Sequence, residues 1–411
     1  MGYTRDFLKG LGWIGFFRFG VKAIIFFKVI IAYRYLSPRE VGLFGLAAIA
    51  LGLLEMVTET GINVVLIRDT KHISYYLDTA FLISIGRGIL IGAILLLSSF
   101  LLPTFFRDPG LFPLLLIVSL IPVIKGFINP AEVIFVKDLR FEKEAIFRIG
   151  LALIDALSAV LLVFYFHSAQ SLIWAMVITA LSEVIISFLF IHPRPGVSFN
   201  RGIYHEIMSP GKWINLTGIV TYAEQNFDNV IVGRVLGATS LGYYQTAFNL
   251  TRSGVAEIGV AFSQVLLPIY GRIVGDSSRI RKAVAKVLIP AAGMMLLVAV
   301  LLNVPQIQNL LLFFLKEKWR PMLILFPYLS VTAWITGMDT LIVPLFIAKN
   351  KIKLLALLYT LGLVLMIGFM FIFTETFGLT GAALAVMISR LLLQPFFIWN
   401  TIKIVQEKQK G

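Results

Sequence analysis

Residues 77–103 have the sequence LDTAFLISIGRGILIGAILLLSSFLLP, which is almost entirely apolar. Its only charged side chains are Asp78 near the start and Arg87 in the middle. A helix of about 20 apolar residues is long enough to cross the hydrocarbon core of a bilayer. The stretch therefore predicts a transmembrane helix and sets the pattern to look for in the rest of the chain.

Similar apolar runs, bounded by charged or turn-forming residues, recur along the sequence and predict about twelve spans. They are expected at 11–34, 41–66, 77–103, 110–136, 143–166, 170–191, 211–235, 240–269, 283–314, 321–348, 352–374 and 379–402. The segment 304–316 is either the end of the ninth span or a short interfacial helix. The predicted fold class is an all-α polytopic membrane protein.

The composition agrees with this class. The 411 residues are 58% hydrophobic and only 14% charged, whereas soluble domains carry about a quarter charged residues. Cysteine is absent, which excludes disulfides, thiolate nucleophiles and zinc–thiolate sites. No small-residue cleavage site follows the first apolar run, so we expect that run to remain as a span.

Lysine and arginine predict the orientation, because cytoplasmic loops of membrane proteins carry an excess of both. With the N-terminus inside, most loop lysines and arginines fall on the inner side. We expect a multi-pass protein of the inner (plasma) membrane with both termini in the cytoplasm. This distribution explains the net charge of +14 better than nucleic-acid binding does.

An internal repeat divides the chain. A constant offset aligns Trp13 with Trp213 and Arg34 with Arg234. Two bundles related in this way around a central cavity are typical of alternating-access transporters. The predicted parts are an N-terminal six-helix lobe at 1–195, a cytoplasmic linker at 196–210 and a C-terminal six-helix lobe at 211–411.

Charges inside the spans are the candidate functional groups. A charge at mid-membrane costs about 2.5–3.5 kcal/mol even on a lenient scale, so each needs a partner or a wet cavity. Arg18, Lys22 and Lys28 share one face of the first span, given about 100° of rotation per residue. We predict that this basic face binds an anionic group.

Acidic pairs spaced four residues apart occur on two other spans. Glu224 and Asp228 lie on the seventh span, and Glu55 and Glu59 on the second. These acids either neutralise the basic face or bind a proton or sodium ion. Further charges in spans either hold the bundle together or take part in function: Arg87, Lys125, Asp155, Glu183, Arg252, Glu257, Asp339 and Arg390.

Motifs of enzymes do not occur in the sequence. There is no phosphate-binding Gly-rich loop with its lysine, no HExxH and no nucleophile elbow. The four histidines have no metal-ligand spacing. We therefore expect no catalytic residue, no metal site and no enzyme activity.

Several phrases resemble a known family. They are LSPREVGLFGLA at 36–47, TGINVVLIRD at 60–69, VKDLRFEKEAIFRI at 136–149 and NFDNVIVGRVLGATSLGYYQTAFNL at 226–250. The chain resembles prokaryotic polysaccharide transporters, the O-antigen-type flippases of the multidrug/oligosaccharidyl-lipid/polysaccharide exporter superfamily. The last four predicted spans match mainly by hydropathy, and many relatives have fourteen spans where this sequence predicts twelve.

The resemblance implies two six-helix lobes in a V around a central cavity. It also implies transport of polyprenyl-diphosphate-linked oligosaccharide to the outer leaflet, driven by an ion gradient. A diphosphate needs fixed cations along its path. The residues expected to bind it are Arg18, Lys22, Lys28 and Arg252, and those expected to couple H⁺ or Na⁺ are Glu224, Asp228, Glu55 and Glu59.

No other cofactor is expected. The expected partners are the lipid-linked glycan, membrane lipid and a polysaccharide polymerase or glycosyltransferase complex, without nucleic acid. The alternatives within the superfamily are a multidrug (organic-cation) antiporter and a flippase for the peptidoglycan precursor. From other classes, a membrane-embedded enzyme or a scaffold also stays open.

Overall fold

The computed structural model describes residues 20–58, 62–68, 73–273 and 277–406. This part of the chain consists of helices and their connections and contains no strand, which confirms the predicted all-α class. The described residues form two compact units, divided between Ala223 and Glu224. We call them unit 1 and unit 2.

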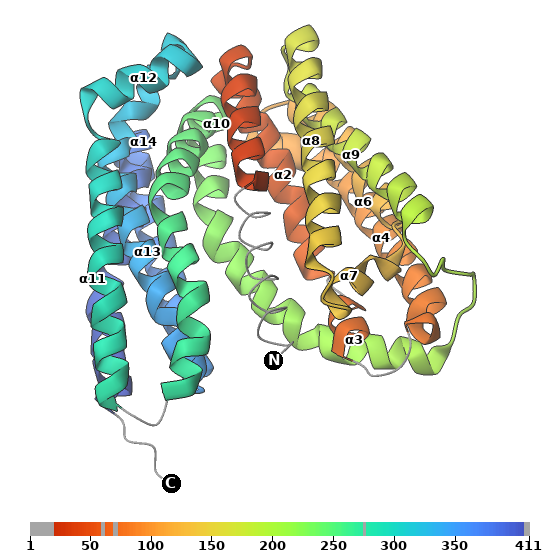
Figure 1. Cartoon of the computed structure of the whole chain (residues 1–411). Coiled ribbons are helices and arrows are strands. Elements are labelled where there is room, and N and C mark those ends of the chain that lie inside the picture. The colour runs from red at the N-terminus through yellow and green to blue at the C-terminus, as the bar shows by residue number, and fades with distance from the viewer. Residues whose placement is uncertain (1–19, 59–61, 69–72, 274–276, 407–411) are drawn as a thin grey trace. The chain divides into compact units, whose positions relative to one another are not determined.

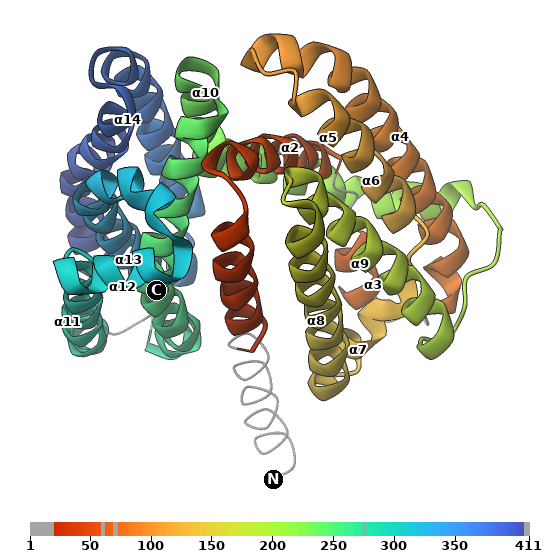
Figure 2. The ribbon, with the colours of Figure 1, turned by 90° about the horizontal axis from the view of Figure 1, so that it is seen from above.

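Unit 1 begins, within the described residues, with a helical segment at 20–35. It continues with α2 (Pro38–Val57), α3 (Ile62–Arg68), α4 (Ser74–Phe106), α5 (Leu111–Val118), α6 (Leu120–Lys125), the 3₁₀ helix η1 (Pro130–Val133), α7 (Ile134–Lys137), α8 (Phe141–Phe166), α9 (Ala169–Phe190) and the first part of α10 (Arg201–Ile273). Within it, α8 lies beside α9 (Figure 1), and α4 lies beside α5 and α6 (Figure 2).

Unit 2 contains the rest of α10. It continues with α11 (Ser277–Leu301), α12 (Pro305–Leu315), the 3₁₀ helix η2 (Glu317–Leu325), α13 (Phe326–Ala348) and α14 (Ile352–Gln406). An apolar core that includes Met295, Leu341 and Phe397 joins α11, α13 and α14, which lie side by side in Figure 1. The segment 304–316 holds a helix of its own, α12, which is separate from α11.

Seven described helices are long and apolar enough to cross a membrane: α2, α4, α8, α9, α11, the η2–α13 stretch and α14. An eighth follows if α5–α6 and η1–α7, bent by 70°, count as one span. A multi-pass membrane protein is thus shown. The count of twelve spans, the six-helix lobes and their boundaries at 195 and 211 stay predictions.

The two longest helices are each broken at a glycine. The 73-residue α10 is interrupted at Gly237 (φ 81°, ψ 173°), and the 55-residue α14 at Gly378 (φ 58°, ψ −135°). A straight helix of 55 residues would be roughly 80 Å long, far more than a bilayer core. Positive φ favours glycine, which explains why a glycine stands at each break. Both breaks occur where the sequence predicts one span to end and the next to begin.

The outer faces of the helices are apolar. Leu97, Phe100 and Leu101 on α4 are 66%, 62% and 71% exposed. Such patches are unfavourable in water, but they match the hydrocarbon of a bilayer. The same helix packs its other face through small residues, since a Cβ atom on Gly88 would lie 2.3 Å from the Pro122 carbonyl oxygen of α6.

Candidate functional site

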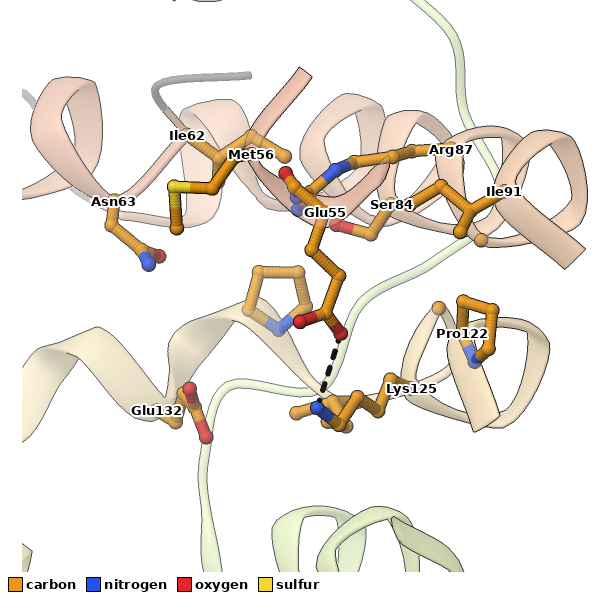
Figure 3. Close-up of a pocket in the computed structure, with 14 residues that line it drawn as sticks. Glu55, Met56, Ile62, Asn63, Ser84, Arg87, Ile91, Pro122, Lys125 and Glu132 are labelled. Atoms are coloured by element: carbon orange, nitrogen blue, oxygen red, sulfur yellow. Dashed lines mark hydrogen bonds and ion pairs between the residues drawn. The ribbon is translucent and has the colours of Figure 1, made fainter. Parts of the chain in front are cut away.

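A polar cavity of about 300 Å³ lies within unit 1, where α2, α3, α4, α6 and η1 meet (Figure 3). Its polar lining consists of Glu55, Asn63, Ser84, Arg87, Lys125 and Glu132. The cavity lies at the bend between α6 and η1. Non-helical backbone at membrane depth needs protein or water around it, so a bent span and a polar cavity belong together.

Asn129 stabilises the bend. Its side chain accepts a hydrogen bond from the Ala131 backbone N–H at 3.0 Å, and Pro130 starts the 3₁₀ helix. The carboxamide also donates to the backbone oxygens of Ile191 (3.2 Å) and Pro193 (3.1 Å). Asn129 is fully buried. The first bond satisfies the Ala131 N–H at the start of η1. The other two tie the bend to the end of α9.

Lys125 and Glu55, which both line the cavity, point toward each other, as Figure 3 shows. The Lys125 Nζ lies 3.3 Å from Glu55 Oε1. Arg87 is held beside them, because its guanidinium donates to the Glu55 backbone oxygen at 2.6 Å and to Thr58 Oγ1 at 3.1 Å. Glu55, predicted for ion coupling, is thus paired with a lysine.

Glu132 connects the cavity to a second ionic group. Arg148 on α8 lies 3.2 Å from Glu132 Oε1 and 3.0 Å from Glu183 Oε1 on α9. The other oxygen of Glu132, Oε2, is buried and has no hydrogen-bond partner among the described residues. The sequence did not single out Glu132 or Asn129, although the Asn129-Pro130 dipeptide is a typical turn signal.

The basic face of the first span is only partly described. Arg18 lies outside the described residues, and Lys22 is exposed. Lys28 makes an ion pair with Asp155 of α8, with 2.6 Å between Lys28 Nζ and Asp155 Oδ2. Both side chains are mostly buried, 17% and 20% exposed. Two charges that the sequence treated separately are therefore partners.

In unit 2, the predicted acidic pair on α10 is divided between two environments. Glu224 forms an ion pair with Arg390 of α14. Asp228 is buried and accepts hydrogen bonds from the Tyr244 hydroxyl at 2.8 Å and from the side-chain Nδ2 of Asn229 at 3.0 Å.

The break at Gly237 makes the Asp228–Tyr244 contact possible. The two residues are 16 positions apart, which is about 24 Å along a straight helix. The bend brings Tyr244 back to Asp228, a contact that the sequence did not predict. Arg252, predicted to bind substrate, is exposed and close enough to Asp228 for electrostatic attraction.

Glu59 and Asp339 are the remaining acids that the sequence placed inside spans and that are considered for ion coupling. Glu59 lies outside the described residues. Asp339 is buried in the apolar core of unit 2, where Gln394 donates to its Oδ1 at 2.9 Å while Oδ2 has no partner within the described chain. No group of three or more His, Asp or Glu residues in the described ranges could hold a metal ion.

Comparisons with known proteins agree with this architecture. The model of the family described as polysaccharide biosynthesis protein matches residues 30–324. Over 333 residues the chain is 22% identical to the lipopolysaccharide biosynthesis protein WzxC of Escherichia coli (strain K12), with 78% of this chain and 65% of WzxC covered. It is also 22% identical to an uncharacterized membrane protein in the cps region of Klebsiella pneumoniae, covering 96% and 82%.

Solved structures show the fold. An inward-facing multidrug resistance transporter of the MATE family, in the MOP superfamily, superposes with a TM-score of 0.72 at 15% identity, covering 93% of this chain and 96% of that one. The lipid II flippase MurJ in an inward closed conformation gives 0.65 at 16%, covering 94% and 89%. The chain thus has the fold of these membrane transporters, although it spans less than two thirds of the length of WzxC.

Proposed function

Because the chain belongs to the polysaccharide biosynthesis protein family, we propose that it is a flippase for polyprenyl-diphosphate-linked oligosaccharide. The family membership confirms the resemblance that the phrases at 36–47 and 226–250 indicated. In this proposal the protein carries the glycan headgroup across the cytoplasmic membrane by alternating access, and both termini lie in the cytoplasm. It acts as a transporter without bond-making chemistry.

The observation that carries the proposal is the ionic chemistry inside apolar helices. Unit 1 alone holds the Lys28–Asp155 and Lys125–Glu55 pairs and Arg148 between two glutamates. Charges at membrane depth are expensive and typically mark a path for a polar substrate. A scaffold in lipid has no need of them.

The names of the relatives suggest the kind of cargo. WzxC is named for lipopolysaccharide biosynthesis, and MurJ is named as a lipid II flippase. A lipid-linked glycan suits a path lined by charges, because its polar headgroup cannot cross hydrocarbon unaided while its tail remains in lipid.

Arg18, Lys22, Lys28 and Arg252 are the proposed ligands of the diphosphate. Lys28 is already paired with Asp155. Binding of a phosphate there exchanges one anion for another, so the ammonium is never left buried without a partner. Arg252 presents an exposed guanidinium that can bind phosphate oxygens in a bidentate manner.

Ion coupling is the second part of the proposal. Glu224 and Glu55 are each paired with a cation, whereas the hydrogen-bond partners of Asp228 within the described ranges are the neutral Tyr244 and Asn229. A buried carboxyl of this kind can take up a proton without breaking an ion pair. We therefore assign proton uptake first to Asp228 and second to Asp339, whose contact is also neutral.

The test is export by cells and by the purified protein. Deletion of the gene should remove surface polysaccharide, and the intact gene should restore it. In liposomes, the purified protein should expose polyprenyl-diphosphate-linked oligosaccharide to an enzyme added outside. Exposure no faster than in protein-free liposomes would refute the proposal.

Variants of the basic face test the headgroup site. We expect Arg18→Ala or Lys22→Ala to lower export about tenfold or more, because each charged hydrogen bond contributes about 1.5–3 kcal/mol. The amount of protein in the membrane should stay the same. Normal export by the double variant would remove these residues from the site.

The alternatives within the superfamily have different readouts. An organic-cation antiporter would lower drug accumulation in cells. A flippase for the peptidoglycan precursor would support growth when the cell's own precursor flippase is depleted. We expect neither result, and copurification with a polysaccharide polymerase or glycosyltransferase would support the proposed complex.

A further inference from the structure

We propose that the cavity of unit 1 is a subsite for one sugar unit of the lipid-linked glycan. The inference rests on the proposed function, and it concerns a site separate from the basic residues assigned to the diphosphate. It is carried by the size of the cavity, by the balance of its charges and by a buried acceptor, Glu132 Oε2, that has no partner in the described part of the chain.

The size of the cavity fits a single ring. Sites for small molecules are typically about 300–1,000 Å³, and this cavity, at about 300 Å³, is at the lower end. One hexose fits such a space, whereas several linked sugars do not. Met56, Ile91 and Pro122 supply apolar walls for the C–H faces of a ring.

The charges on the wall cancel. The ionic side chains that line the cavity are two cations, Arg87 and Lys125, and two anions, Glu55 and Glu132. A diphosphate would be favoured by excess positive charge and an organic cation by excess negative charge. A balanced wall favours a neutral ligand, and its many charged donors and acceptors favour one rich in hydroxyl groups.

The wall also presents hydrogen-bonding capacity that the protein leaves unused. Glu132 Oε2 is buried without a partner among the described residues, although its carboxylate is fixed by Arg148 through Oε1. The Lys125 ammonium has three donors, and among the residues that the structure describes its hydrogen-bond partner is Glu55. Sugar hydroxyls can donate a hydrogen bond to Glu132 Oε2 and accept one from the Lys125 ammonium at the same time. A fully ionised anion has no hydrogen to donate to Glu132.

Access to the cavity can be measured cleanly because the natural chain has no cysteine. Ser84 lines the cavity, so Ser84→Cys places a single thiol in its wall. An exposed thiol on the loop before α10, Ser198→Cys, is the matched control in the same unit. Both variants are labelled in membranes with a neutral, water-soluble maleimide.

We expect lipid-linked glycan to protect the cavity thiol. Labelling of Ser84→Cys should be at least threefold slower in membranes that contain lipid-linked oligosaccharide than in membranes from cells that cannot start its synthesis. Ser198→Cys should label equally in both. Adding Lys125→Met or Glu132→Leu should abolish the protection, whereas Glu132→Gln, which keeps an acceptor oxygen, should retain part of it.

Probes of known chemistry separate the ligand classes. Methyl glycosides of glucose, galactose and N-acetylglucosamine are added to the purified Ser84→Cys protein, with inorganic pyrophosphate and tetraphenylphosphonium as charged controls. Protection by at least one glycoside supports the subsite. Protection only by pyrophosphate or only by the cation overturns it, and so does the absence of protection in both membranes and purified protein, which would mean that the cavity holds water.

Export by the same strains distinguishes the two proposals. If the intact protein exports no polysaccharide and flips no lipid-linked glycan, the proposed function fails. If the protein exports normally but Ser84→Cys is never protected, only the sugar subsite fails. Variants whose amount in the membrane falls are replaced in the comparison by Glu132→Gln.

Discussion

Lys28 and Asp155 are 127 positions apart in the chain and 2.6 Å apart in space, and each is the other's charge partner inside unit 1. Breaking a buried pair by removing one partner costs about 3–5 kcal/mol, because the remaining charge stays buried. The pair is thus a structural requirement as well as a candidate for function, and the two roles can be separated.

We predict that Lys28→Ala and Asp155→Ala each lower the melting temperature of the purified protein by several degrees. The exchanged pair, Lys28→Asp with Asp155→Lys, should recover most of that stability, because the opposite charges still meet. Export should stay low in the exchanged protein, since the cation has moved to α8. Recovery of both stability and export would show that the pair only holds helices together.

Asp228 is the carboxyl to which we assign proton uptake. If it takes up the coupling proton, Asp228→Asn should make transport into liposomes insensitive to an imposed pH gradient, while protein with Asp228 responds. Asp108→Asn is the control, because Asp108 pairs with Arg39 in unit 1 at 2.5 Å and has no proposed role in transport. A normal gradient response from Asp228→Asn would exclude this carboxyl.

Close packing of α4 on α6 predicts that two glycines of α4, Gly86 and Gly88, respond differently to substitution by alanine. A Cβ atom at Gly88 would meet the Pro122 carbonyl oxygen at 2.3 Å, whereas one at Gly86 would meet nothing within 4 Å. Gly88→Ala should therefore cost about 1–3 kcal/mol by overpacking. Gly86→Ala should be neutral or stabilising by up to about 1 kcal/mol, because alanine favours the helix.

Thermal unfolding of the two purified variants in the same detergent checks this contrast. Gly88→Ala should also shrink or distort the cavity, because Gly88 and Pro122 both line it. Equal melting temperatures for the two variants would mean that α4 and α6 separate at no cost.

Helix breaks that follow local signals could be predicted from the sequence, whereas the bend at Asn129 could not. Apolar runs predicted the spans, and the breaks at Gly237 and Gly378 occur between runs, because hydropathy and glycine are local signals. The bend at Asn129 divides one continuous apolar run, so periodicity did not detect it. Its stability comes from hydrogen bonds to Ile191 and Pro193, more than sixty positions away.

The candidate site follows the same rule. The sequence identified Glu55, Lys125 and Lys28 as charges that need partners, but it could not assign the partners. Pairing depends on which helix faces meet, and Lys28 pairs with Asp155 rather than with an acid near its own position in the chain. Glu132 lies in a short 3₁₀ helix without an amphipathic pattern, so nothing local marked it.

For the molecule as a whole, the exposed apolar surface of α4 and its neighbours requires a lipid or detergent environment. The positive-inside pattern then predicts that both chain ends face the cytoplasm. A green fluorescent protein fused at the C-terminus should fluoresce, and alkaline phosphatase at the same position should be inactive. The reverse pattern would place the C-terminus outside the cytoplasm and contradict this prediction.

The break at Gly237 makes the angle between the two arms of α10 a measurable property of the protein. A Cβ atom at Gly237 would meet no other atom within 4 Å. The backbone conformation of Gly237, with φ 81° and ψ 173°, is nevertheless practically restricted to glycine. The hydroxyl of Tyr244 reaches Asp228 only while the two arms of α10 stay folded toward each other. A pair of spin labels, one on each arm, would therefore read the angle of α10 directly while the protein works.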